Sequence, residues 1–511
     1  MPVPDFINAL HSPTAYPHPV TEVRLIETHI SWVLLAGEYA YKIKKPVNLG
    51  FLDFSTLDQR RFCCEEELRL NRRLEPDTYL EVVAITGDGT TAVIQGKGPV
   101  LEWAVRMRAF PADATLDREP EITPDQIDVI ADRIARFHKT IDPSPADSDF
   151  GTPESVMHPV RENFAQLHEL LKEADPDTLR RIDELERWSE AEGIHLESHF
   201  RVRKSTDHVR ECHGDLHLGN IAWADGRPII FDCIEFNPSL RHIDIVSEAA
   251  FLFMDLTERG HPGLAWRFLN RWLEHTGDFA GLAGFRFYLV YRAMVRAKVA
   301  GIRSAQNAKP DLTELQHYLD QARTFCRKPD PSLILMHGHS GSGKTWLSQR
   351  MLEARGAVRL RSDVERKRLF GLDALEDSAN IAGGIYGPEA NQHTLNHLLI
   401  DAESLLQAGF TVIVDATFIA RSWRQPFFDS ARKHGWPIHI VAMNVAAEEM
   451  RRRIQARARL SNDASEAGLE VLEAQLANAE PLDENELKVT RAYSPDEPEA
   501  WPLLLEWLNS F

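Results

Sequence analysis

A glycine-rich octapeptide, GHSGSGKT at 338–345, is the feature that most constrains the fold of this 511-residue chain. It matches the pattern GxxxxGK[ST] in full, follows the apolar run LILMHG and precedes the helix-like segment WLSQRMLEA. In this setting the glycines let backbone N–H groups point at a phosphate, and the helix N-terminus adds positive potential. The expected phosphate-binding residues are Gly338, His339, Ser340, Gly341, Ser342, Gly343, Lys344 and Thr345.

Strands and helices alternate regularly around this motif. LILMHG, AVRLRSD, TVIVDAT and PIHIVAMN are short apolar runs, each followed by a helical stretch, and KVTRAY near position 488 is the expected last strand. This alternation predicts a doubly wound parallel sheet with helices on both faces. The polar segment CRKPDPS carries two prolines and predicts a linker at 326–331, followed by a P-loop domain over 332–511.

Polar residues follow these strands at the edge of the sheet where the P-loop must lie. Lys344 is placed to reach the β- and γ-phosphates, and Thr345 to bind Mg²⁺. Asp363 comes just after the second strand, and Arg366 follows it by one helical turn, so both can face the site. Asp415 ends the third strand, where its carboxylate is a further candidate ligand for Mg²⁺.

Arginines are concentrated in two helical segments after Asp415. Arg421 and Arg424 follow the third strand, and Arg453 and Arg457 are spaced four apart, which places them on one face of a helix. The second pair is suited to close over ATP as a lid and neutralise the charge of the transferred group. The alternative is a solvated face whose partners are the nearby Glu448 and Glu449.

A second pattern typical of phosphate transfer, HGDLHLGN, occupies residues 213–220. Four residues separate Asp215 from Asn220, as in the kinase loop HRDxxxxN, and Asp232 follows at the end of the run PIIFDC. Phosphoryl transfer needs mainly a positioned nucleophile and charge neutralisation by metal ions. A carboxylate that emerges from a strand, such as that of Asp232, suits a metal ligand.

A domain of this kind also needs a strand lysine held by a helix glutamate. YAYKIKKPV offers Lys42 and Lys44 on one face of a strand, and the helical segment CEEEL offers Glu65, Glu66 and Glu67. We expect the pair Lys42 and Glu66, with the neighbouring residues as alternatives. The other interpretation is that these lysines lie on a solvated edge strand.

In the N-terminal part of the chain, the predicted secondary structure changes from mainly strands to mainly helices near Pro124. Before it come short β-runs such as VRLIET, WVLLAG and PVLEWAVRMRAF, together with one helix expected over 56–74. After it, DQIDVIADRIARFHKT has apolar residues at helical spacing, and mostly helices follow. We therefore expect a bilobal α+β domain over 1–325, with a small lobe of about 20–110 and a helical lobe of about 111–325.

These residues resemble the aminoglycoside phosphotransferase-like family of the protein-kinase-like superfamily, over roughly 20–305. The resemblance rests on HGDLHLGN, FDCIEF, IADRIARFH and RHIDIVSEAAFLFMDL. No GxGxxG precedes the strand lysine, which departs from the kinase pattern, so the loop that covers the phosphates is expected elsewhere, at ETHIS.

The resemblance implies a role for each matching residue. Asp215 would act as catalytic base or orient the hydroxyl, and Asn220 and Asp232 would carry Mg²⁺. The backbone from Arg108 to Phe110 would be the hinge that meets adenine.

The C-terminal residues, from about 332 to 495, resemble the small P-loop kinases: polynucleotide 5′-kinases, zeta-toxin-like kinases and gluconate-type sugar kinases. The DxxR arrangement and DATFIARSWR look most like the polynucleotide kinase branch. This likeness implies that Asp363 activates an acceptor hydroxyl, that Arg366 contacts an acceptor-side phosphate, and that Arg457 belongs to the lid. The whole chain resembles bacterial proteins described as bifunctional aminoglycoside phosphotransferase/ATP-binding proteins.

Composition narrows the function classes. A formal net charge of −19 argues against wrapping a long nucleic acid, although a local groove for a strand end is compatible with it. None of the five cysteines forms a CxxC pair, which leaves an irregular zinc site at Cys212, His213, His217 and Cys233 as the alternative reading of that region. No apolar run reaches about 18 residues, so we expect a cytoplasmic protein without a membrane partner.

Together, the patterns predict a kinase that uses ATP and Mg²⁺ at two sites and transfers the γ-phosphate to hydroxyl groups of small molecules. Two alternatives stay open. One is a polynucleotide 5′-hydroxyl kinase-like activity in the C-terminal domain, and the other is a switch in which one nucleotide site senses ATP and regulates the other domain. The patterns carry no information on oligomeric state.

Overall fold

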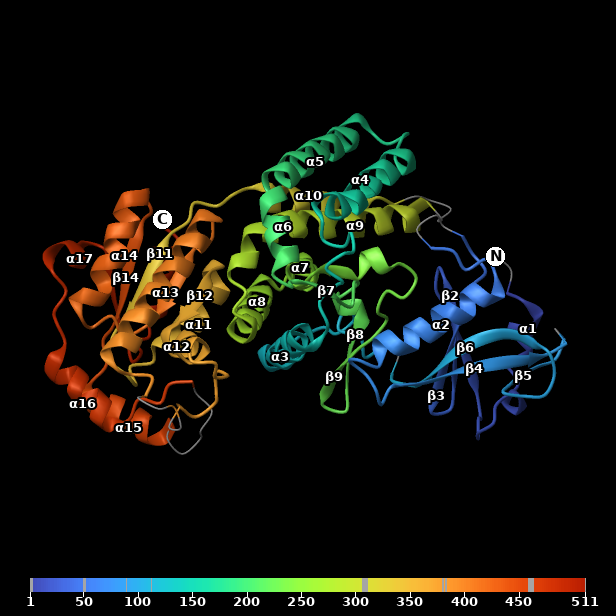
Figure 1. Ribbon diagram of the computed structural model, residues 1–511, viewed down its shortest axis with the longest axis horizontal. Helices are drawn as coiled ribbons and strands as arrows, with labels where there is room; N and C mark the ends of the chain where they lie inside the picture. Colours follow the sequence, from blue (N-terminus) through green and yellow to red (C-terminus); the bar gives the residue numbers. More distant parts are fainter. Residues whose placement is uncertain are drawn as a thin grey trace. The chain divides into compact units, whose positions relative to one another are not determined.

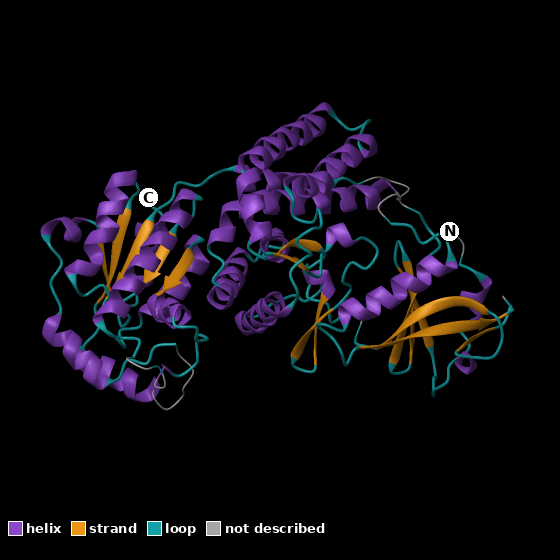
Figure 2. Cartoon of the chain, in the orientation of Figure 1, coloured by secondary structure: helices purple, strands orange, loops and turns teal. Residues whose placement is uncertain are grey.

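The computed structural model describes residues 3–48, 52–88, 90–111, 113–305, 311–378, 381, 384–457 and 464–510. The chain divides into two compact units. Figures 1 and 2 show the helices and strands of the described residues. The first holds the N-terminal sheet and the HGDLHLGN segment, and comprises Met1–Val129, Thr140–Glu162 and Phe200–Leu252. The second holds most of the remaining helices and the parallel sheet, and comprises Ile130–Lys139, Asn163–His199 and Phe253–Phe511.

The first unit begins with a six-stranded antiparallel sheet in the order β1-β2-β3-β6-β4-β5. Helix α2 (Leu57–Asn71) contacts β4 and β6, and its N-terminus is closed by a capping box between Thr56 and Gln59. The strands are β1 (Val23–Glu27), β2 (Ser31–Ala36), β3 (Tyr39–Lys44), β4 (Tyr79–Gly87), β5 (Ala92–Ile94) and β6 (Val100–Arg108). They lie where the β-runs of the sequence predict them.

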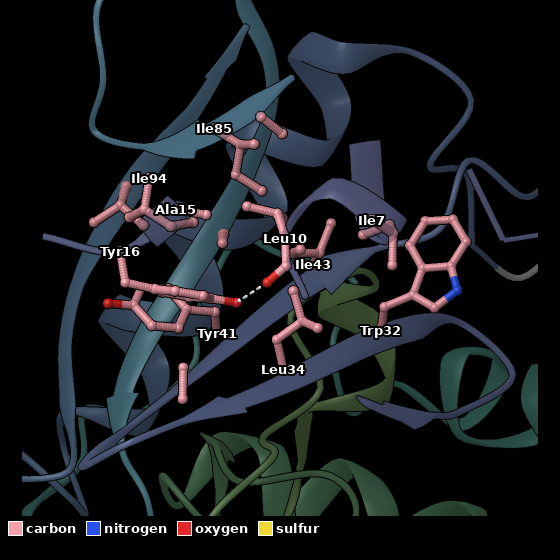
Figure 3. Close-up of a cluster of buried hydrophobic side chains, with 14 residues drawn as sticks. Ile7, Leu10, Ala15, Tyr16, Trp32, Leu34, Tyr41, Ile43, Ile85 and Ile94 are labelled. Carbon is pink, nitrogen blue, oxygen red and sulfur yellow. Dashed lines mark hydrogen bonds between the residues drawn. The ribbon is translucent and has the colours of Figure 1, made fainter. Parts of the chain in front are cut away.

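One face of this sheet is covered by residues from 3 to 16 (Figure 3). Helix α1 (Asp5–Ala9) and the short turn η1 (Pro13–Ala15) bring apolar side chains, among them Ile7 and Leu10, onto β2 and β3, and the Tyr16 hydroxyl donates to the Leu10 carbonyl at 2.8 Å. Tyr41 and Ile43 of β3 point into this core. Because side chains alternate along a strand, Lys42 and Lys44 lie on the opposite face.

The segment HGDLHLGN follows β7 (Val209–Glu211) and ends with the turn η2 (Leu218–Asn220). An antiparallel hairpin of β8 (Ile221–Ala224) and β9 (Arg227–Ile230) follows, and the chain then passes Asp232. Strand β7 pairs with β10 (His242–Asp244), which leads into α7 (Ile245–Glu258). The loop is therefore anchored at both ends by strands.

The predicted helix-rich stretch is confirmed. It contains α3 (Pro124–Thr140), α4 (Pro153–Leu170), α5 (Pro176–His195), α6 (Glu197–Ser205), α8 (Pro262–Thr276), η4 (Ala280–Gly284), α9 (Phe285–Ala305) and α10 (Thr313–Cys326), together with the 3-10 turn η3 (Pro238–Leu240). Among the described helices, none combines the length and apolar composition that a membrane span requires.

The second sheet has five parallel strands in the order β12-β13-β11-β14-β15. Ile334 and Met336 of β11 pack against α11 and α18, so Leu333 and Leu335, which are also buried, face the other side. The strands are β11 (Leu333–His337), β12 (Val358–Arg361), β13 (Val412–Asp415), β14 (Ile438–Met443) and β15 (Thr490–Tyr493). The helices are α11 (Lys344–Arg355), α12 (Ser362–Leu369), α13 (Pro388–Gln407), α14 (Arg421–His434), α15 (Ala447–Arg457), α16 (Leu469–Asn478), α17 (Glu484–Lys488) and α18 (Ala500–Leu508).

Candidate active sites

Two lysines of β3 share one carboxylate of α2. The Lys42 ammonium lies 2.8 Å from Glu67 Oε1 and also pairs with Asp232. The Lys44 ammonium pairs with the other Glu67 oxygen and with Glu235. The side chains of Lys44 and Glu67 are fully buried. This network links the sheet, the helix and the segment after β9 at one point.

The glutamate of the pair is Glu67 and not Glu66, so this part of the sequence prediction is wrong. Glu66 pairs instead with Arg69 at 2.9 Å and with Arg241 at 3.3 Å. Neighbouring positions on a helix point about 100° apart, so only one of two adjacent glutamates can face the sheet. The buried residues Cys64 and Asn71, at positions i−3 and i+4 from Glu67, lie on that same face of the helix.

The charges of this network stabilise one another against the cost of burial. Burial alone would raise the pKa of Glu67, but Lys42 and Lys44 lower it to about 2. Burial alone would lower the pKa of Lys42, but Asp232 and Glu67 raise it well above its usual range. Lys42 therefore stays charged at neutral pH, which its expected role in binding phosphate requires.

The loop carrying Asp215 is held in shape by hydrogen bonds inside the motif. Asn220 Nδ2 donates to the Asp215 carbonyl at 2.9 Å and to Asp215 Oδ2 at 3.0 Å. The Gly214 N–H donates to Glu248 Oε1 at 2.7 Å, and His213 Nε2 donates to the Phe231 carbonyl at 2.8 Å. Since the Asn220 nitrogen is used within the loop, its Oδ1 is the atom left to act as a metal ligand.

Asp232 stands in a backbone conformation that side chains rarely adopt. Its φ is +67°, in the left-handed region, which costs on the order of 1 kcal/mol for a non-glycine residue. The Asp232 N–H donates to the Tyr79 hydroxyl at 3.2 Å, and the preceding residue, Phe231, donates its N–H to the Asn220 carbonyl at 3.0 Å. This backbone bond joins the segments that carry Asn220 and Asp232, and an amide oxygen together with a carboxylate is a donor set of the kind that Mg²⁺ accepts.

The expected hinge lies at the end of β6. The N–H groups of Arg108 and Ala109 donate to the carbonyls of Thr78 and Glu38 at 2.8 and 2.9 Å. The Phe110 ring packs 5.0 Å from that of Phe231, the residue before Asp232. The expected hinge thus contacts the residue that precedes Asp232, while its contact with adenine stays a prediction.

The ETHIS segment forms the turn between β1 and β2. The Thr28 N–H donates to the Ser31 carbonyl at 2.9 Å, and the Ser31 N–H donates back to Thr28 Oγ1 at 3.0 Å. Its role as the phosphate-covering loop stays a prediction.

The alternative zinc site is not supported by the described residues. Cys212, His213, His217 and Cys233 do not converge as a group of metal ligands. His213 Nε2 already donates to the Phe231 carbonyl. Burial raises the pKa of the Cys233 thiol, which disfavours the thiolate that a metal would bind.

The P-loop follows β11 and leads into α11. Gly341 and Gly343 have φ values of +79° and +92°, which only glycine adopts without strain. A Cβ at Gly341 would lie 2.8 Å from the Met450 carbonyl, so the loop passes close to α15. The Lys344 ammonium donates to the His339 carbonyl at 2.9 Å, across the loop.

Two polar atoms of the loop are buried without a hydrogen-bond partner. They are Ser342 Oγ and His339 Nε2, and Ser342 itself is only 1% exposed. Buried polar groups are normally paired, so such atoms indicate a ligand that completes the site. A phosphate group, which accepts several hydrogen bonds, fits this donor set.

Carboxylates stand on the P-loop side of the sheet. Asp415 ends β13, which lies between β11 and β12, and its Oδ2 accepts from Ser348 Oγ at 3.2 Å. Burial lowers the pKa of Lys344, and the charges of Asp415 and Asp363 partly offset this effect. The hydroxyl of Thr345 and the carboxylate of Asp415 are oxygen donors of the kind that Mg²⁺ prefers, and their role as metal ligands stays a prediction.

Arg366 is more enclosed than the sequence suggests. It is 5% exposed, donates to Asn391 Oδ1 at 2.6 Å and to the Ile385 carbonyl at 3.1 Å, and lies 5.1 Å from the centroid of the Tyr386 ring. These contacts hold the start of α13 beside α12. The expected contacts of Asp363 and Arg366 with an acceptor stay predictions.

Helices α15 and α16 contact the P-loop through Arg453, one of the two arginines expected in the lid, and through Gln475, which sequence reasoning did not select. Arg453 donates to the Ser342 carbonyl at 3.2 Å, and Gln475 Oε1 accepts from the Ser340 N–H at 2.8 Å. Arg457, the expected lid residue, donates to the Ala467 carbonyl at 2.8 Å. No sequence signal distinguishes Gln475, which lies 130 or more positions from the loop in an ordinary helix.

The solvated-face alternative holds for part of the arginine cluster. Arg452 and Arg453 pair with Glu449, and Arg451 pairs with Glu448, at 2.7 to 2.9 Å. Arg424 serves a structural contact. It is fully buried and pairs with Glu486 at 2.6 Å.

Two family profiles match the chain, one in each part. Residues 64–288 match a family described as a phosphotransferase enzyme family, and residues 333–482 match one described as an AAA domain. Proteins described as uncharacterized, from Mycobacterium tuberculosis and Mycobacterium bovis, are 31% identical over 466 residues, which is 88% of this chain and 89% of theirs. The chain belongs to the same family. It joins an aminoglycoside phosphotransferase-like module to a P-loop kinase-type module, as the sequence predicts, and these matches support ATP-dependent phosphotransfer as its general activity.

Solved structures of kinases are similar to parts of the chain. A gluconokinase from Sinorhizobium meliloti 1021 is 20% identical, covers 36% of this chain and 94% of its own, and has a TM-score of 0.26. A Plasmodium vivax ethanolamine kinase is 12% identical, covers 60% of this chain and 82% of its own, and has a TM-score of 0.36.

The stability of the P-loop module should depend on the protonation of His337, which ends β11. Burial, with the nearby charge of Arg424, lowers the pKa of His337 from 6.5 to about 4. Between these values the unfolded chain binds more protons than the folded chain, so stability falls as the pH drops from 6.5 to 4. We expect His337→Gln to weaken this dependence.

Hydrogen exchange of peptides covering β11, corrected for intrinsic rates, measures the effect at pH 4 to 6.5. The matched control is His434→Gln, which replaces an exposed histidine of α14 in the same module. An identical pH dependence in His337→Gln and the parent chain would contradict the prediction.

Proposed function

We propose that this chain is a kinase with two Mg²⁺–nucleotide sites, each of which transfers the γ-phosphate of ATP to a hydroxyl group of a small molecule. In the first module, Lys42 holds phosphate oxygens, Asn220 and Asp232 hold the metal, and Asp215 orients the acceptor hydroxyl. In the second, the P-loop holds the phosphates, Thr345 and Asp415 hold the metal, and Asp363 activates the acceptor. The boundary between the modules falls at 326–331, between the end of α10 and the start of β11.

One observation carries the proposal for the first site. Lys42 bridges Glu67 and Asp232, so the phosphate-binding lysine and a metal-binding carboxylate meet at one point, although they are 190 positions apart. Asp232 also keeps a left-handed backbone, and backbone strain of this kind is concentrated at functional sites. Mg²⁺, when bound, would cancel charge on the transferred group.

A transfer assay tests the proposal. The purified chain is incubated with γ-labelled ATP, Mg²⁺ and a pool of hydroxyl-bearing metabolites, and labelled products are separated. We expect Asp215→Asn to remove one set of products and Lys344→Ala another, and chelation of Mg²⁺ to remove both. The control is Arg452→Ala, which changes an exposed side chain of α15 and should leave both sets.

The same assay separates the alternatives. Label on a 5′-hydroxyl oligonucleotide that depends on Lys344 would assign the second site to polynucleotide ends. If no product exceeds that of the double variant Asp215→Asn/Lys344→Ala, the proposed activity is wrong.

A further inference from the structure

An exposed tryptophan stands directly beside the P-loop. Trp346 follows Thr345 in the first turn of α11, and 54% of it is exposed. Arg350, one turn further along, lies with its guanidinium carbon 4.9 Å from the Trp346 ring centroid and 4.1 Å from that of Trp501. Arg350 therefore contacts two indoles, and its cation–π contact with Trp346 restrains an otherwise exposed ring.

The position of Trp346 in the helix directs this ring toward the phosphate end. Helix α11 begins at Lys344, so the N–H of Trp346 is one of the four that have no partner within the helix. Side chains in an α-helix lean toward its N-terminus, which here is the end that faces the P-loop. Arg350 lies four residues toward the C-terminus, and Trp346 stays 54% exposed beside it, so the indole keeps surface for a ligand.

Single exposed aromatic residues are common and need no ligand. Two features set this one apart. Its orientation is already restrained, so a stacking partner loses little freedom on binding, and it adjoins a loop whose buried Ser342 hydroxyl has no partner. A nucleotide has both groups that such a site would take: phosphates for the loop and a flat aromatic base for the indole.

We propose that Trp346 is the base-stacking residue of the P-loop site, and that a purine ring packs on its exposed face while Arg350 and Trp501 support the indole from behind. The inference rests on the proposed function of this site, and it adds which residue binds the base. It needs no metal contact and no change of fold.

The test compares a ligand that has a base with one that lacks it. Calorimetry of the full chain, carrying Asp232→Asn to disable the first site, is run with Mg²⁺–ATP and with Mg²⁺–tripolyphosphate. Trp346→Ala should weaken ATP binding about tenfold, as expected for loss of one base–aromatic stack, and leave tripolyphosphate binding unchanged. Trp346→Phe, which keeps a ring, should retain most of the affinity for ATP.

A matched control is available in the same module. Trp436 also stacks on a neighbouring side chain, with its ring 4.5 Å from that of His434. It precedes β14, so it lies at the opposite end of the parallel sheet from the P-loop, and Trp436→Ala should change neither affinity.

Three results would count against the inference, and they are distinguishable. An equal loss for both ligands in Trp346→Ala would mean that the loop itself is disturbed, and unchanged ATP affinity would mean that the indole does not bind the base. Either result overturns the inference alone. If Lys344→Ala abolishes the binding of neither ATP nor tripolyphosphate, the proposed function of the site is wrong, and the inference fails together with it.

Discussion

Replacing Asp215 by asparagine should slow phosphate transfer at the first site about 100- to 10,000-fold, the range expected for loss of a residue that takes a proton in the transition state. The change keeps the shape of the side chain. The lysine network that would hold the nucleotide does not include Asp215, so the affinity for ATP should stay the same. Single-turnover label transfer and nucleotide titration on the same preparation measure the two effects separately.

The β8–β9 turn offers a matched control for this substitution. Asp225 is exposed in that turn, close in sequence to the loop, and has a left-handed backbone that asparagine tolerates. Asp225→Asn should leave the rate unchanged. Equal rates in Asp215→Asn and the parent chain would remove the assigned role, and a parallel loss of ATP affinity would show that Asp215 contributes to nucleotide binding.

The parts of the fold that sequence patterns predict well are those that local sequence encodes. The P-loop is one continuous segment, and its conformation depends on glycines such as Gly341 and Gly343, which have positive φ. The parallel sheet follows from apolar runs that each end in a helix. For the same reason, the spacing of Asp215 and Asn220 is visible in the sequence: a hydrogen bond within the loop joins them.

Choices between neighbours depend on contacts that local sequence does not contain. Glu66 and Glu67 are the same residue type at adjacent positions, and only the packing of α2 on the sheet decides which of them contacts Lys42. Gln475 reaches the P-loop because α15 and α16 pack together through Met450, Ile454 and Leu472, far from the loop in sequence. In both cases the deciding contact lies outside the local sequence: the packing of α2 on the sheet in the first, and the packing of α15 with α16 in the second.

The N-terminal boundary of the small lobe shows a further limit. The expected lobe begins near residue 20, yet Ile7 and Leu10 are fully buried in the core of the sheet. The segment that carries them forms only a short helix, α1, whose five residues are too few to show helical periodicity. This segment contributes to the fold by burying hydrophobic side chains, and a pattern that identifies only strands and helices does not predict that contribution.

Arg424 illustrates how a charged residue near a motif can serve stability. It follows Asp415 on α14, which suggested a place at the site, but its side chain is completely buried. Its Nε and Nη2 donate to the two Glu486 oxygens at 2.6 and 3.1 Å, and Nη1 donates to the Phe418 carbonyl at 2.9 Å. The guanidinium thus joins α14 to α17 and to the loop after β13.

Arg424→Met should therefore destabilise the P-loop module by about 3–5 kcal/mol, because it leaves the Glu486 carboxylate buried without its partner. Denaturant unfolding, followed by hydrogen exchange of peptides from β13 and α17, measures the loss.

Arg421→Met is the matched control on the same helix: Arg421 is 60% exposed, its pair with Asp483 spans 3.2 Å, and its removal should cost less than about 1 kcal/mol. The double variant Arg424→Met/Glu486→Leu should recover part of the loss, since no charge is then left unpaired. Equal stability of Arg424→Met and Arg421→Met would show that the buried pair does not hold these elements together.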